Sequence, residues 1–304
     1  MNSIRSRSAG PRWFDTLLAW YFVVVWGSGY LATKTGIHYA APFTFLVLRF
    51  AVALACLGVI VAIVRPPWPT SPSQIGHLIV AGLLMHAANL GGSHYAQYLG
   101  LSAGVTAVIL ALQPLATALI AARWMRQPLV GAQWIGVFLG FAGVALIVWH
   151  KIDVREISAG ALIAVAVSLV SITAGTLYQR VFCPTANLWT GAVIQFAASI
   201  IVLAPLAVSV EGFVIVWSWR LAAAVAFLVI FASLLAVNAL HTLMRHGEAA
   251  KVTSLLYLTP IIAVVLEYLM YGVVPSALSA LGILITCAGV ALVALVRPSG
   301  SSRK

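Results

Sequence analysis

The sequence has very few charged residues. Asp, Glu, Lys and Arg make up 8% of its 304 residues, whereas 62% are apolar. A soluble domain is typically about half apolar and a quarter charged, so this chain cannot cover a water-facing surface. Acidic residues are the scarcest, with six against 17 Lys and Arg, which gives a net charge of +11. The basic residues lie between apolar runs and form no polar domain, which argues against nucleic-acid binding.

Cysteines and the motifs of catalysis are also scarce. Cys56, Cys183 and Cys287 are too scattered for a disulfide framework and contain no CxxC pair, so we interpret them as small packing residues. The sequence contains no HExxH, GxSxG, P-loop or Cys/His metal spacing. These absences argue against an ATP-driven pump. We expect no catalytic residue, no metal site and no cofactor.

Long apolar runs fill most of the chain. A membrane-spanning helix needs about 20 mostly apolar residues. Ten stretches fit, namely 14–33, 42–64, 75–98, 102–124, 130–149, 158–179, 187–208, 218–240, 251–272 and 277–296. The first follows basic residues but has no A-x-A-like cleavage site, so we interpret it as a retained helix. The sequence therefore predicts an all-α membrane protein with ten transmembrane helices.

The positions of Lys and Arg indicate the orientation, because short loops rich in these residues face the cytoplasm. A cytoplasmic N-terminus leaves only Lys34, Lys151, Arg155 and Arg220 in outer loops. Apart from Arg49, which lies within a span, the other basic residues fall on the inner side. We therefore expect both termini in the cytoplasm, with tails at 1–13 and 298–304, and a multi-pass protein of the bacterial inner membrane.

The second half of the sequence repeats features of the first at an offset of 146 residues. The matches are Pro114 with Pro260, Gly136 with Gly282, and the AGVAL strings at 142–146 and 288–292. Two halves, 14–150 and 151–297, would each hold five helices, and an odd number gives them opposite orientations. The sequence therefore predicts two inverted five-helix repeats, an arrangement that is typical of transporters.

The matched prolines fall near the middle of the fourth and ninth spans. A proline inside a helix removes one backbone hydrogen bond and kinks the chain. Pro114 and Pro260 are therefore either hinges beside a central site or residues that curve two helices so that they pack.

Two charges lie deep inside the predicted spans. Arg49 and Glu267 are about 10 Å and 8 Å from the outer ends of their helices at 1.5 Å per residue. Opposite signs at similar depth predict an ion pair, with Glu267 as a proton-coupling carboxylate. His86 is the second candidate proton site, because imidazole titrates near neutral pH. The alternative is that Arg49 and Glu267 each reach the outer surface.

Polar residues also recur on helical faces. His86, Asn89, Ser93 and Gln97 are spaced 3, 4 and 4 residues apart, which places them on one face of the third span. They are either the lining of a central cavity, which we favour, or interhelical hydrogen-bond partners. In the sixth span, where Ser168 and Ser171 lie among small residues, we favour packing. The predicted substrate-binding residues are Trp26, Tyr30, His86, Asn89, Ser93, Gln97, Gln113 and Tyr257.

Several motifs, in order along nearly the whole chain, resemble those of the ten-helix drug/metabolite transporter superfamily, specifically the EamA-type permeases. They are WGSGY at 26–30 with Lys34, Pro42 with Arg49-Phe50, LSAG at 101–104 with QPL at 113–115, QWIG at 133–136 with AGV at 142–144, and the run from Arg245 to Pro260. Gln127 and Val273 stand where the resemblance implies an acidic residue. The resemblance implies export of amino acids or other small metabolites.

We therefore expect a secondary transporter, an exporter that works by alternating access, with protons as the candidate coupling ion. A channel or a receptor-like membrane protein is the alternative. An intramembrane enzyme is less favoured, because only Glu267 and scattered histidines could supply a catalytic pair. The expected partners are a small-molecule substrate and the lipid bilayer, without nucleic acid, for a monomer or a homodimer.

Overall fold

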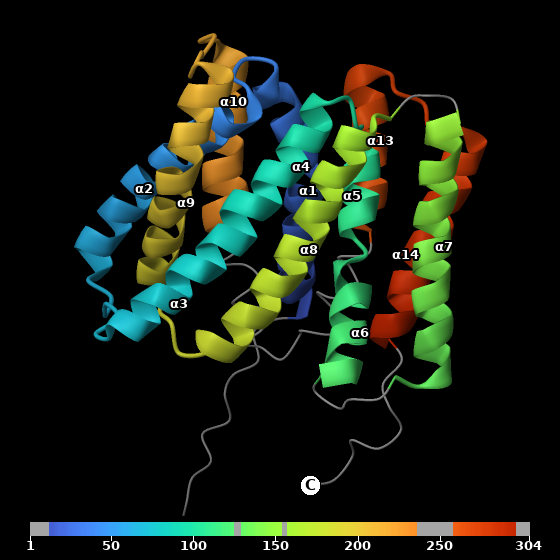
Figure 1. Ribbon diagram of the computed structural model, residues 1–304, viewed down its shortest axis with the longest axis horizontal. Coiled ribbons are helices and arrows are strands. Elements are labelled where there is room, and N and C mark those ends of the chain that lie inside the picture. The colour runs from blue at the N-terminus through green and yellow to red at the C-terminus, as the bar shows by residue number, and fades with distance from the viewer. Residues whose placement is uncertain (1–11, 125–128, 154–156, 236–257, 296–304) are drawn as a thin grey trace, which may run out of the picture.

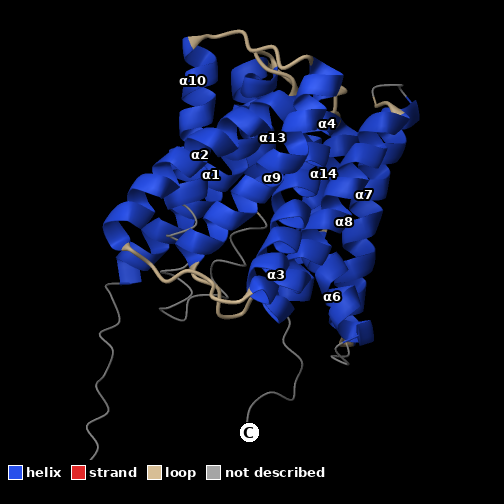
Figure 2. Cartoon of the chain, turned by 60° about the vertical axis from the view of Figure 1, so that its left-hand side comes forward, coloured by secondary structure: helices blue, strands red, loops and turns tan. Residues whose placement is uncertain are grey.

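The computed structural model describes residues 12–124, 129–153, 157–235 and 258–295. Within these ranges the chain is helical throughout, and its only extended pairing is an isolated bridge between Ala40 and Ile215 (Figures 1 and 2). The all-α prediction is therefore confirmed for the part of the chain that is described.

The helices follow one another with short connections. The first half contains α1 (Arg12–Ile37), α2 (Pro42–Val64), α3 (Pro72–Gly82), the π-helical segment η1 (Leu83–Ala88), α4 (Asn89–Tyr98), α5 (Ala103–Leu110), α6 (Gln113–Trp124) and α7 (Gly131–Asp153). The second half contains α8 (Ala159–Phe182), α9 (Leu188–Glu211), α10 (Trp219–Ala226), the π-helical segment η2 (Phe227–Leu235), α13 (Thr259–Tyr271) and α14 (Ala277–Leu295).

Seven helical stretches of the described chain are long and apolar enough to cross a membrane. Three shorter apolar stretches, Trp219–Leu235, Thr259–Tyr271 and Ala277–Val293, occupy the remaining predicted positions. Large apolar side chains such as Ile63, Trp149 and Ile201 are exposed on the outside of the bundle. A lipid environment accepts such a surface, because apolar side chains gain nothing there by being buried.

The fourth predicted span is interrupted. The sequence predicts one kinked helix over 102–124, whereas α5 ends at Leu110 and α6 begins at Gln113, after a turn at Ala111 and Leu112. Pro114 explains the break, because its ring lacks an N–H group and clashes with the carbonyl group four residues earlier. Pro260 likewise lies in the first turn of α13.

Helix starts in the two halves recur at the offset of 146 residues. Helices α2 and α9 begin at residues 42 and 188, α6 and α13 at 113 and 259, and α7 and α14 at 131 and 277. The π-helical segments obey the same offset, since η1 shifted by 146 falls inside η2. The recurrence therefore extends from short motifs to the boundaries of whole helices.

The two largest clusters of buried apolar side chains lie in different parts of the bundle. One joins α1, α2, α9, α10 and η2 through residues such as Phe22, Phe50 and Leu228. The other joins α4, α5, α7, α8 and α14 through residues such as Val108 and Ile147. In Figure 1 the helices α2, α9 and α10 lie at the left and α7 and α14 at the right. Side chains of α2 and α14 therefore belong to different parts of the molecule.

Helices α7 and α14 lie side by side (Figure 1), and glycines lie at their contact. A Cβ atom on Gly136 would lie 2.6 Å from the carbonyl oxygen of Gly289, and one on Gly143 would lie 2.5 Å from that of Gly282. At the offset of 146 residues, Gly282 is the counterpart of Gly136 and Gly289 is that of Gly143. Each glycine of α7 therefore contacts the counterpart of the other one. This is the contact pattern of two antiparallel helices related by a two-fold axis.

We expect Gly143→Ala to destabilise the protein by about 1–3 kcal/mol, because its methyl group has no room against the backbone of α14. The measurement is the thermal unfolding midpoint of the purified protein in detergent. Gly58→Ala is the matched control, since a Cβ atom there meets nothing within 4 Å. Equal midpoints for the two variants would contradict the close contact of α7 and α14.

Candidate functional site

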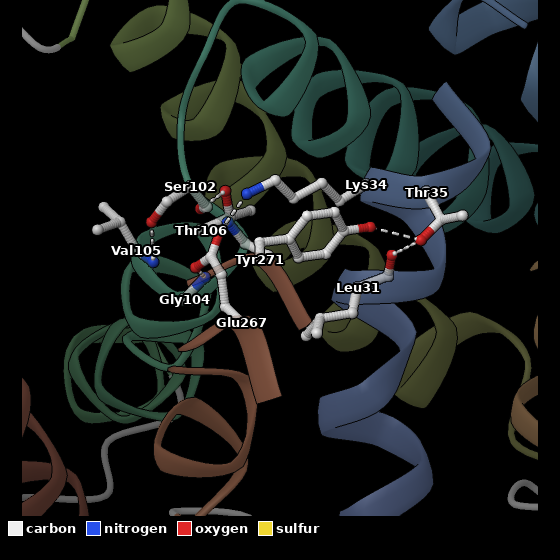
Figure 3. Close-up of polar contacts among 10 residues, drawn as sticks. Leu31, Lys34, Thr35, Ser102, Gly104, Val105, Thr106, Glu267 and Tyr271 are labelled. Atoms are coloured by element: carbon white, nitrogen blue, oxygen red, sulfur yellow. Dashed lines mark hydrogen bonds and ion pairs between the residues drawn. The ribbon is translucent and has the colours of Figure 1, made fainter. Parts of the chain in front are cut away.

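A buried carboxylate joins three helices. Glu267 of α13 is 3% exposed, and its Oε1 atom lies 2.6 Å from the Nζ atom of Lys34 on α1. The same carboxylate accepts hydrogen bonds from the backbone N–H groups of Ala103 (3.0 Å) and Gly104 (2.8 Å), in the first turn of α5. Figure 3 shows the carboxylate between the lysine and the start of that helix.

The first turn of α5 accounts for the position of this carboxylate. The first N–H groups of a helix have no partner within the helix, and its N-terminus carries a partial positive charge that favours an anion. The side chain of Ser102 accepts from the N–H group of Val105, and Glu267 takes the two N–H groups before it. The carboxylate is therefore stabilised by the helix as well as by Lys34.

The ring of Tyr271 contacts Lys34, and a hydroxyl group in turn holds Tyr271. Its Nζ atom lies 4.5 Å from the centre of the Tyr271 ring, within the range of a cation–π contact. The Tyr271 hydroxyl lies 2.6 Å from Oγ1 of Thr35, which itself donates to the carbonyl group of Leu31 (Figure 3). The tyrosine is then the donor to Thr35. We call Glu267, Lys34, Tyr271, Thr35 and the first turn of α5 the Glu267 cluster.

The predicted pairing of Arg49 with Glu267 is wrong. Arg49 is 9% exposed and donates from Nη2 to Oγ of Ser233, on η2, at 3.3 Å. Similar depth did not bring the two charges together, because α2 packs against α9 and η2, whereas α13 packs against α1 and α5. Both side chains are buried, so the alternative in which they reach the outer surface is wrong as well.

The sequence predicts Lys34 in an outer loop, whereas the structure places it in the last turn of α1. A usable signal was present in the sequence, since Trp26, Tyr30 and Lys34 are spaced four residues apart and share one helical face. At 22% exposure the lysine is the more accessible member of the ion pair.

A second carboxylate was missed altogether. Glu211, the last residue of α9, accepts from the backbone N–H groups of Phe43 (2.9 Å) and Thr44 (2.8 Å) and from the hydroxyl of Thr44. Helix α2 starts after Ala41, which has no side-chain acceptor to cap the helix. The missing cap was the signal that an acceptor had to come from elsewhere in the chain.

The polar face of the third span makes contacts with two different helices. His86 lies 3.1 Å from Oε1 of Gln195 on α9, whose amide donates to Gln179 on α8. The hydroxyl of Ser168, also on α8, lies 2.7 Å from both the backbone carbonyl oxygen and Oδ1 of Asn89, which share its one hydrogen. For His86 and Asn89, these contacts agree with the second interpretation, in which the polar face forms hydrogen bonds between helices.

The remaining part of that face is less fully bonded. Ser93 donates to the carbonyl group of Leu90 and lies 3.3 Å from Nδ1 of His94, a histidine that the sequence analysis did not select. The Oε1 atom of Gln97 is buried without a hydrogen-bond partner in the described structure. A lining role for this face stays a prediction.

The other predicted residues are dispersed. Trp26 is exposed beside Phe22, and Tyr30 packs against a small apolar cluster around Leu31. Gln113 donates to Thr176 of α8 at 3.0 Å. Tyr257 and Gln127 lie outside the described residues, and Val273 is exposed after α13.

We expect a charge swap in the Glu267 cluster to fail. Glu267→Gln should cost about 2–3 kcal/mol, because two backbone N–H groups and a lysine lose an anionic acceptor. Lys34→Gln should cost about 1 kcal/mol, since the carboxylate keeps the helix N-terminus. Lys34→Glu combined with Glu267→Lys should be at least as unstable as Glu267→Gln, because an ammonium group would face the first turn of α5. Detergent-solubilised protein can be compared by thermal unfolding. A double variant more stable than both single variants would indicate a simple ion pair and would contradict the contribution of the first turn of α5.

Comparison with known proteins agrees with this architecture. The chain is 27% identical over 255 residues to the "Uncharacterized inner membrane transporter YedA" of Escherichia coli. The matched region covers 83% of this chain and 81% of that protein. It is 27% identical over 272 residues to the "Uncharacterized transporter YvbV" of Bacillus subtilis, with 84% and 83% covered. A "Probable amino-acid metabolite efflux pump" of Escherichia coli matches at 25% identity over 166 residues, 55% of this chain and 53% of that protein.

The fold and the family are found independently of each other. A protein of known crystal structure superposes with a TM-score of 0.64 at 20% identity, over 94% of this chain and 98% of that chain, which shows a shared fold. The model of the EamA-like transporter family matches twice, at residues 14–149 and 158–295. Together with the apolar helices, these relatives place the chain in the bacterial inner membrane as a multi-pass protein. The chain belongs to the EamA-like transporter family, within the drug/metabolite transporter superfamily.

Proposed function

We propose that this protein is a secondary transporter that exports amino acids or other small metabolites by alternating access. The observation that carries the proposal is that helices are interrupted at corresponding positions of the two halves. Transporters with internal repeats bind their substrates near the middle of the membrane, at helices that are discontinuous there.

The first pair of interruptions consists of the π-helical segments. Segment η1 lies between α3 and α4, and η2 follows α10. π-Helical turns are rare in proteins, and those that occur are often found at functional sites. Two of them at the offset of 146 residues support a site that both halves build.

The second pair of corresponding positions is that of the prolines. Pro114 follows the break between α5 and α6, and Pro260 lies in the first turn of α13. Proline cannot continue a preceding helix, because its ring clashes with the carbonyl group four residues earlier, and it suits the first turn of a separate helical segment. This location supports the hinge interpretation, in which the two helices bend as access alternates.

Ten spans in two inverted halves complete the proposal. The crossed glycine contacts of α7 and α14 and the recurrent helix starts support halves at 14–150 and 151–297. In Figure 1, α1 begins and α14 ends at the lower edge. This agrees with two cytoplasmic termini, the orientation that the basic residues favour.

Topology can be tested separately from transport. Reporter fusions after residues 153 and 304 should report the periplasm and the cytoplasm respectively, because an odd number of spans separates the two points. Detection of both fusions in the same compartment would contradict the inverted halves.

The relative named as an amino-acid metabolite efflux pump supports the choice of substrate class and direction. The Glu267 cluster supports protons as the coupling ion. A proton on Glu267 would weaken both the ion pair with Lys34 and the bonds to α5, and would so release α1 from α13. Proton exchange at the carboxylate would then accompany separation of the helices.

Comparison of the medium of overexpressing and deleted cells by metabolomics should reveal a solute that depends on this protein. In proteoliposomes that solute should move with saturable kinetics and exchange against itself, as a carrier requires. A flux that rises without limit with concentration would instead favour the channel.

The same proteoliposomes test the two finer parts of the proposal. Pro114→Ala and Pro260→Ala should lower the turnover number while the unfolding midpoint stays within a few degrees. Glu267→Gln should remove the dependence of flux on pH. Normal turnover in both proline variants would refute the hinges, and an unchanged pH profile would remove Glu267 from coupling.

A further inference from the structure

Among the described residues, the buried cation Arg49 has no acidic partner. The structure describes one hydrogen bond of its guanidinium group, from Nη2 to Ser233, and its Nε atom is buried without a partner. Guanidinium has five N–H donors and stays charged at any physiological pH. A charged group in this position is costly unless something compensates it.

Apolar side chains surround the arginine on its own helix. Phe45, Leu46 and Phe50 are buried in the core that joins α1, α2, α9 and α10. The surroundings therefore lower the effective dielectric constant and strengthen the attraction of Arg49 for any anion that reaches it.

The protein has few anions to offer. The sequence contains six acidic residues. The two whose side chains the structure describes, Glu211 and Glu267, are bound at the first turns of α2 and α5. In the described part of the chain, the only ion pair is that of Lys34 with Glu267. Arg49 thus has donors to spare and no described carboxylate to receive them.

Both π-helical segments lie close to this arginine. Ser233 belongs to η2, and its hydroxyl donates to the carbonyl group of Leu228 at 2.9 Å, so its oxygen faces Arg49 as an acceptor. On the other side, Phe50 stacks on Phe196 and meets the ring of His86, on η1, edge-on at 6.0 Å. Arg49 is therefore held where the interruptions of the two halves come together.

We infer that Arg49, oriented by Ser233, binds the carboxylate group of the transported solute. This inference rests on the proposed function and adds a substrate class to it, namely small solutes that carry a carboxylate, such as free amino acids or organic acids. The planar guanidinium fork donates two parallel hydrogen bonds to a carboxylate, a geometry that an ammonium group cannot match. The solute thus supplies an anion where the described residues supply none.

The test uses the full-length protein in detergent and measures its melting temperature. The probes are the free amino acids, acetate and benzoate, each compared with its amide, and sodium chloride and inorganic phosphate as further anions. At least one carboxylate should raise the melting temperature, and its amide should not. Arg49→Gln should weaken that binding by about tenfold or more, because a desolvated charge contact is lost.

Two variants separate binding from folding. Ser233→Ala removes only the orienting hydroxyl and should weaken binding by a smaller factor. Arg65→Gln is the matched control, since it removes an exposed arginine at the end of the same helix and should bind normally. If Arg49→Gln does not fold, Arg49→Lys keeps the charge without the fork and should still bind more weakly than the wild type.

Several outcomes would overturn the inference. They are equal stabilisation by an acid and its amide, by chloride or by phosphate; no stabilisation by any carboxylate; and undiminished binding in the Arg49 variants. Transport distinguishes this inference from the proposed function. A solute without a carboxylate that is carried saturably would uphold transport and refute the carboxylate subsite. A carboxylate that binds at Arg49 but is not carried would uphold the carboxylate subsite and argue against transport.

Discussion

The structure depends on one constraint, which is that backbone N–H groups in a membrane must find their acceptors within the protein. Every interruption of a helix creates such groups. Two carboxylates meet this demand, Glu211 at the first turn of α2 and Glu267 at the first turn of α5. Each comes from near the end of another helix, so satisfying a helix start also fixes which helices are neighbours.

The two buried charges follow different rules under this constraint. Glu267 is compensated by a lysine and by a helix N-terminus, and it belongs to the structure as it stands. Arg49 has a serine hydroxyl as its described partner. Among the described residues, Glu267 therefore has an ion-pair partner and Arg49 has none. A carboxylate bound at Arg49, as we infer, would also stabilise the folded protein.

Much of the fold could be predicted from the sequence because lipid imposes a simple test on each segment. The predicted span 42–64 coincides with α2, and the start of α14 was placed at the correct residue, 277. Pro114 located the break in the fourth span. The π-helical segments could not be found, since Leu83–Ala88 is an apolar run with no distinctive residue beyond His86. The error over Arg49 has a geometric cause: depth along a helix is one coordinate, and the direction in which a side chain points depends on packing that hydropathy does not encode.

The glycine contacts between α7 and α14 also limit how the molecule can move. Side chains that interdigitate can exchange rotamers and let helices slide, but backbone against backbone at Gly136 and Gly143 leaves nothing to rearrange. We therefore expect this pair of helices to stay fixed during the proposed transport cycle. Because α14 is the repeat counterpart of α7, the fixed pair would contain one helix from each proposed half. The movement that opens and closes the protein would then fall on the interrupted helices.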